Sequence, residues 1–64
     1  MSGDAACLVF LEHELTAFAA QHPREKTIDV LQKTWRKMSA AGQDAARGLT
    51  LPPPAAELVA AALR

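Results

Sequence analysis

The sequence of 64 residues has little of what stabilises very small proteins. It contains one cysteine, Cys7, which excludes an internal disulfide, and no group of residues has the spacing of metal ligands. The three glycines are scattered at positions 3, 42 and 48, which excludes a glycine-rich phosphate loop. Two phenylalanines and one tryptophan are the only aromatic side chains. The chain therefore has material for one small domain of low stability at most.

Charge and hydropathy exclude further classes of partner. Seven basic residues balance seven acidic residues, so a nucleic acid is not expected as a partner. The apolar run from Ala5 to Leu11 is too short to span a bilayer, and it has no basic region like that of a secretory signal. The unpaired cysteine fits a reducing, intracellular compartment and leaves the organelle open, a mitochondrial assembly included.

The chain also lacks the residue patterns of catalytic sites. Neither G-x-S-x-G nor H-E-x-x-H occurs. Glu12 and Glu14 are two residues apart, so on a helix they point in different directions and do not form a carboxylate pair. His13 and His22 have no evident third ligand, and we expect them at a solvent-facing position and at a helix C-terminus. We therefore expect no enzymatic activity, cofactor, metal or small-molecule substrate.

The clearest pattern lies between Thr27 and Ser39. Four large apolar residues there recur at steps of three, four and three, which places them on one side of a helix. These are Ile28, Leu31, Trp35 and Met38. Polar residues occupy the opposite side, and Thr27 is predicted as the N-cap. A helix of about a dozen residues is marginal in water, so this apolar side needs a neighbour.

A second helix with the same spacing is predicted from Asp4, as N-cap, to His22, where Pro23 prevents its continuation. Its apolar side consists of Leu8, Leu11, Leu15 and Phe18. Val9, Phe10 and Ala17 widen the apolar surface beyond one side, so this helix is expected to contact more than one neighbour.

The remainder is predicted as two weaker helices with a spacer between them. Ser39 can cap a helix from Ala40 to Arg47 that stops at Gly48. Residues 49–54 contain three prolines and are predicted to be extended. Residues 55–64 are predicted as a short helix with Leu58, Val59 and Leu63 on one side. This helix either folds back or reaches another subunit.

These predictions describe an all-α protein. Residues 1–48 form a small helical hairpin or three-helix unit, 49–54 an extended proline spacer, and 55–64 a short C-terminal helix. Because the large apolar side chains are few, the balance between burial and chain entropy is close to zero. We therefore expect either a subunit that completes its folding on a partner or a marginal three-helix unit.

Residues 5–43 resemble the front half of an HMG box. The resemblance lies in Phe10, in the His22-Pro23 pair that ends the first helix, and in Trp35-Arg36-Lys37-Met38-Ser39, which is similar to the W-x-x-[ML]-S of that family. The resemblance implies an L-shaped three-helix unit that binds the DNA minor groove. The implied phosphate contacts are Arg24, Lys33, Arg36 and Lys37.

The leading functional hypothesis is a non-enzymatic accessory or structural subunit of a larger protein assembly, which packs amphipathic helices against partner subunits. The alternative is a minimal DNA-binding protein similar to an HMG box. The predicted interface with partners comprises Leu8, Leu11, Leu15, Phe18, Ile28, Leu31, Trp35, Met38, Leu58, Val59 and Leu63.

Overall fold

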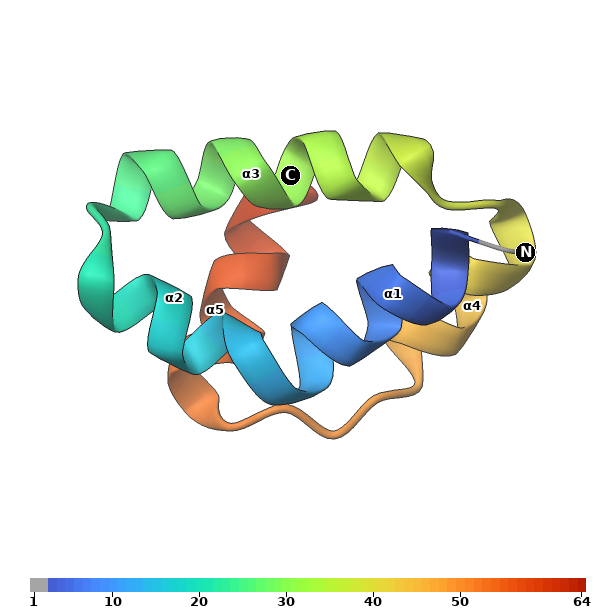
Figure 1. The fold of residues 1–64 in the computed structure, drawn as a ribbon, viewed down its shortest axis with the longest axis horizontal. Coiled ribbons are helices and arrows are strands. Elements are labelled where there is room, and N and C mark those ends of the chain that lie inside the picture. Colours follow the sequence, from blue (N-terminus) through green and yellow to red (C-terminus); the bar gives the residue numbers. More distant parts are fainter. Residues whose placement is uncertain (1–2) are drawn as a thin grey trace.

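The chain folds into four helical segments, which Figure 1 shows around a common centre. The computed structural model describes residues 3–64, so the first two residues of the predicted domain 1–48 lie outside the described part. The first segment is continuous and comprises α1 (Gly3–Val9), η1 (Phe10–Glu14) and α2 (Leu15–Gln21). It is followed by α3 (Arg24–Lys37), α4 (Ala40–Arg47) and α5 (Pro53–Ala62). The described residues contain no strand, so the all-α prediction is confirmed.

Proline and serine set the boundaries between the first three segments. His22 is extended, with φ −135° and ψ 154°, as expected for the residue before Pro23, and α2 ends at Gln21. At the next boundary, the Ser39 side chain accepts a hydrogen bond from the Gly42 amide at 3.1 Å and caps α4. This cap and the stop at Gly48 were predicted correctly.

The predicted N-cap Thr27 is wrong, because α3 begins three residues earlier at Arg24. Pro23, with φ −60°, takes the position before the first turn. Thr27 lies inside that turn, and its side chain is fully buried. Its hydroxyl donates to the Pro23 carbonyl oxygen at 3.1 Å, which gives the buried polar group a partner.

The middle of the first segment, η1, is a π-helix that the apolar spacing did not predict. The Leu15 amide donates to the Phe10 carbonyl, a five-residue step. The wider turn changes which residues share a side of the helix, and α1 and α2 meet at an angle in Figure 1. As a result α1 reaches α3 and α4, whereas α2 reaches α3 and α5. The first helix therefore has several neighbours, as its wide apolar surface predicted.

The C-terminal part folds back onto the first two long helices. α5 packs against both α2 and α3, and in Figure 1 it lies between them. Its first residues are Pro53 and Pro54, so these two prolines belong to the helix and not to an extended spacer as predicted. Proline is accepted there because the first amides of a helix have no partner within it. Between α4 and α5, Gly48 forms a turn and residues 49–52 have no regular secondary structure.

The core lies where the four segments meet, and every segment contributes to it. Its buried apolar residues are Leu11, Leu15, Leu31, Met38, Ala46, Ala55, Leu58 and Ala62. Two of the four segments, α4 and α5, contribute mainly alanine to the core. Alanine allows these helices to approach their neighbours closely, but it contributes little buried area per residue. The core is consequently small.

Candidate partner-binding surfaces

The predicted interface residues separate into three groups by burial. Leu11, Leu15, Leu31, Met38 and Leu58 lie in the core of the chain itself, with at most 7% of each exposed. Leu8, Phe18, Ile28, Trp35 and Val59 are half-buried, and Leu63 is exposed. The first group is therefore not available as a surface in this structure, because α4 and α5 supply the neighbours that the sequence alone did not place.

The N-terminal helix keeps an apolar surface that faces away from the core. From Ala5 to Leu11 seven consecutive residues are apolar, yet of these only Leu11 is buried. We define the α1 surface as the exposed residues Ala5, Ala6 and Val9 together with the half-buried Phe10 that borders them; Cys7, Leu8 and part of Phe10 pack against the core. Among the large apolar residues that the structure describes, Val9 is 50% exposed and Leu63 is 39% exposed.

Aromatic rings extend from the α1 surface along α2. The centroids of the Phe10 and Phe18 rings are 5.8 Å apart, and the two rings meet edge to face. The centroid of the His22 ring lies 4.0 Å from that of Phe18, with an angle of 32° between the ring planes. An open hollow of about 260 Å³ lies beside these rings. It is lined by Phe10, His13, Glu14, Ala17, Phe18 and Gln21. Glu12 and Glu14 are exposed on the same helix, so acidic groups accompany this apolar region.

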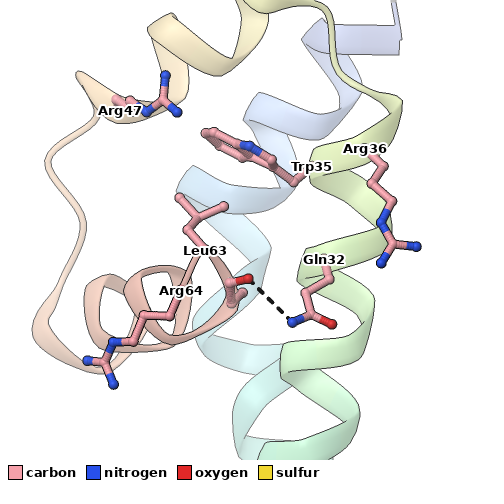
Figure 2. A pocket seen from close by; sticks show the side chains of 7 residues that line it. Gln32, Trp35, Arg36, Arg47, Leu63 and Arg64 are labelled. Atoms are coloured by element: carbon pink, nitrogen blue, oxygen red, sulfur yellow. Dashed lines mark hydrogen bonds between the residues drawn. The ribbon is translucent and has the colours of Figure 1, made fainter.

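A second open hollow, of about 320 Å³, lies between α3, α4 and α5. We call it the Trp35 groove; its lining consists of Gln32, Trp35, Arg36, Arg47, Ala62, Leu63 and Arg64. Figure 2 shows the Leu63 side chain directed toward the Trp35 ring, with Arg36 and Arg64 extending on opposite sides. The Arg47 guanidinium carbon lies 5.3 Å from the Trp35 ring centroid, within the range of a cation–π contact.

Hydrogen bonds from two glutamines hold the walls of the Trp35 groove. Gln43 of α4 donates to the Trp35 carbonyl oxygen at 2.9 Å. Gln32 of α3 donates to the Ala62 carbonyl oxygen at 3.4 Å, a longer contact that Figure 2 draws as a dashed line. Both amides therefore connect α3 to a neighbouring helix at the groove.

The basic residues of α3 divide into paired and unpaired groups. Arg24 binds Glu57 of α5 through both guanidinium nitrogens, one of them at 2.7 Å, and Lys33 lies 2.9 Å from Asp29. Arg36 and Lys37 form no ion pair with any residue in the range 3–64. Lys26, near the start of α3, is also without an ion pair among the described residues, so two of the three free cations of α3 lie at its C-terminal end, where Arg36 lines the Trp35 groove.

The Arg24–Glu57 pair connects α3 to α5 beside a smaller hollow. The hydrogen bond from Arg24 lowers the pKa of Glu57, and the same hydrogen bond raises the pKa of Arg24. Both side chains are about half exposed, so water screens their attraction. The pair holds α5 against α3, and it is lost when acid protonates the Glu57 carboxylate. Its electrostatic contribution to stability is modest.

Asp4 connects α1 to the turn between α3 and α4. Its carboxylate accepts hydrogen bonds from the Ser39 amide, at 3.0 Å, and from the Ser39 hydroxyl. It does not act as the predicted N-cap, because α1 already includes Gly3. The missing side chain of Gly42 leaves room for the carboxylate, since a Cβ there would lie 2.6 Å from Asp4 Oδ2. This contact orients the α1 surface relative to α4.

Three further findings concern other kinds of site. His13 Nε2 lies 3.2 Å from Glu12 Oε1, and both side chains are open to solvent. Within residues 3–64, no three side chains of His, Cys, Asp or Glu gather closely enough to hold a metal ion. The described helices include none with both the length and the apolar character needed to cross a membrane.

Comparison with known families gives one match, which covers residues 2–59. The family is described as a domain of unknown function (DUF4202). Neither a curated protein nor a solved structure matches the chain.

This match overturns the resemblance to an HMG box, because no HMG box family is found. The residues that resemble the HMG box indicate only a helix that ends at a proline and aromatic side chains at helical spacing. Any small helical hairpin can have these features. Two of the four implied phosphate contacts, Arg24 and Lys33, are also engaged with carboxylates of the chain itself.

Proposed function

The chain belongs to the DUF4202 family, and from this premise we propose that it is a non-enzymatic accessory or structural part of a larger protein assembly that binds a partner subunit through the α1 surface. The observation that carries the proposal is the half-exposed Val9 within a run of seven apolar residues. A helix that is apolar on all sides is typically buried on all sides.

The geometry of α1 explains why the chain cannot cover this helix by itself. α1 contacts α3 and α4, and its half-buried residues Cys7 and Leu8 pack against the core. The outer side carries Ala5, Ala6 and Val9, which are all exposed. Covering apolar surface is worth roughly 25 cal/mol per Å², so a partner that packs on this side gains free energy that the isolated chain does not.

The size of a stable interface indicates how far the contact extends. A specific interface buries about 800 Å² on each partner. The whole chain has 4212 Å² of accessible surface, so such an interface occupies roughly a fifth of it. The α1 surface together with the aromatic hollow at Phe10 and Phe18 forms one region along the same helical segment. Glu12 and Glu14 accompany it, which favours a partner with an apolar helix face bordered by lysine or arginine.

The exposed character of the polar groups supports a binding role over a catalytic one. The His13–Glu12 pair is the kind of pair that general acid–base catalysis uses, but both of its members lie in solvent. The three hollows described above are open, so they would not exclude water from a reacting group.

Photo-crosslinking tests the proposal in the cells that make the protein. Benzoylphenylalanine replaces Val9 in one variant and Lys26 in the control; Lys26 is an exposed residue of α3 and forms no ion pair within the described residues. We expect position 9 to crosslink one defined polypeptide and position 26 not to do so. The complex should also be lost in Val9→Glu and retained in Lys26→Glu. Equal crosslinking from both positions, or a complex that survives Val9→Glu, would contradict the proposal.

A further inference from the structure

We propose that the Trp35 groove binds a protein segment in which a large apolar side chain is flanked by acidic residues. This inference goes beyond the proposed function, because it concerns another surface and a partner of opposite charge. It rests on the shape, charge and unused donors of the groove.

The centre of the groove is suited to an apolar side chain. Trp35 is half-buried, Leu63 is 39% exposed, and the two side chains lie close to one another across the hollow in Figure 2. A volume of about 320 Å³ is at the lower end of the usual range for binding pockets. It is therefore suited to a side chain or two and not to a large cofactor. Tryptophan and arginine are also the residues that most often dominate binding energy at interfaces.

The charge of the groove selects acidic flanking residues. All three titratable side chains that line it are arginines, and no carboxylate side chain is part of its lining. Arg36 is without an ion pair in the described part of the chain. Arg47 is shared between Asp44, at 3.4 Å, and the Trp35 ring. Because Arg36 and Arg64 extend on opposite sides, a matching segment places a carboxylate on each side of its apolar residue.

Trp35, which lines the groove, also carries an unused hydrogen-bond donor. The indole N–H of Trp35 can only donate, and it donates to no group among residues 3–64. The Gln43 and Gln32 hydrogen bonds hold both walls before any segment binds. A preformed site loses less entropy on binding, so a short segment can bind with measurable affinity.

A short acidic segment fits better than a nucleic acid. A protein that binds DNA strongly neutralises about six to ten phosphates with lysine and arginine. The groove presents three arginines, of which Arg47 is already shared with Asp44, and the net charge of the chain is zero. Peptide carboxylates on either side of an apolar residue require only two free guanidinium groups.

The test is selection from a phage-displayed library of random peptides against the immobilised chain. We expect the enriched peptides to share an apolar residue with aspartate or glutamate on both sides. Synthetic copies should bind less tightly as salt is added, because exposed charges are screened. A selection that enriches no peptide, or peptides without acidic residues, overturns the inference.

Matched variants then localise the binding. Arg36→Glu should weaken the selected peptides by about tenfold or more, as expected for reversing a charge at an interface. Leu63→Gln should weaken them by removing the apolar wall. The control is Lys26→Glu on the same helix, ten residues or about 15 Å away, which should change the affinity less than twofold. Circular dichroism verifies that each variant is folded. Equal effects of Arg36→Glu and Lys26→Glu overturn the assignment to this groove.

Two outcomes separate this inference from its alternatives. If a random DNA duplex binds as tightly as the peptides at physiological salt and loses binding in Arg36→Glu, the groove is a site for polyanions and the inference fails. Crosslinking from position 9 should be unchanged by Arg36→Glu, because the α1 surface is separate. Loss of peptide binding alone therefore concerns the groove, and loss of the position-9 crosslink alone concerns the proposed function.

Discussion

Gly42 occupies a position where a side chain would displace another residue. The Asp4 carboxylate lies against its Cα and binds the amide and hydroxyl of Ser39, the residue that caps α4. The three residues thus form one contact between α1 and α4. Inside a helix alanine is preferred over glycine, so helix formation does not explain the glycine at position 42. The space that the Asp4 carboxylate needs does explain it.

We predict that Gly42→Ala lowers the free energy of unfolding by about 1 kcal/mol, measured by urea denaturation followed with circular dichroism. Alanine gains about 1 kcal/mol of helix preference, but the displaced carboxylate loses hydrogen bonds that are worth about 1.5–3 kcal/mol when one partner is charged. In the background of Asp4→Ala the clash is absent, so there Gly42→Ala should stabilise by up to about 1 kcal/mol. A stabilising effect of Gly42→Ala in the parent chain would refute this explanation.

The contact between α3 and α5 depends on both apolar and charged residues. Leu31, Ala55, Leu58 and Ala62 are buried in the core that these helices share, and Arg24 binds Glu57 at its edge. Because Glu57 has a lower pKa in the folded chain than its ordinary value of 4.5, the unfolded chain takes up the proton first as the pH falls. The contribution of Glu57 is therefore fully present above about pH 4.5 and is lost at lower pH.

We predict that Glu57→Gln lowers the thermal midpoint at pH 7, and that this difference from the parent chain disappears well below pH 4.5, where Glu57 is protonated. Arg24→Gln should behave in the same way, and the double variant should be no less stable than either single variant. The control is Glu14→Gln, an exposed residue of η1 outside any ion pair of the described chain. A difference that persists unchanged in acid would contradict the assignment to this pair.

The sequence predicted the elements better than their arrangement. Apolar spacing located the two long helices, and Pro23, Ser39 and Gly48 located their ends, because each acts through its own backbone or side chain. The hydrogen bonds of Asp4 with Ser39, of Arg24 with Glu57 and of Gln32 with the Ala62 carbonyl join residues 30 or more positions apart. No local pattern encodes such contacts. The burial of Thr27 was missed for a related reason, since a polar residue is buried only where tertiary packing provides a hydrogen-bond partner.

At the scale of the whole molecule, the return of the C-terminal part closes the core. Residues 49–62 bring Ala55, Leu58 and Ala62 against the first segment and α3. The chain measures about 30 × 22 × 20 Å, so few residues are far from the surface. Its stability therefore depends on every segment being present.

We predict that a chain ending at Arg47 shows no cooperative thermal transition and has reduced helix content per residue by circular dichroism. The full chain should unfold cooperatively with a free energy of no more than about 3–5 kcal/mol, as expected for a single small core. The truncation removes Ala55, Leu58 and Ala62 from the core cluster that also contains Leu15, which is fully buried in the full chain. Cooperative unfolding of the truncated chain at the same temperature would show that α5 is dispensable.

The position of Trp35 has a spectroscopic consequence. It is the only tryptophan, and the chain contains no tyrosine, so its indole is the only strong ultraviolet emitter of the molecule. The ring lies in an open groove under an arginine, where water and quenchers in solution can reach it. Any molecule that occupies this groove shields the ring and shifts its emission to shorter wavelength. The fluorescence of Trp35 therefore reports binding at the Trp35 groove without any added label.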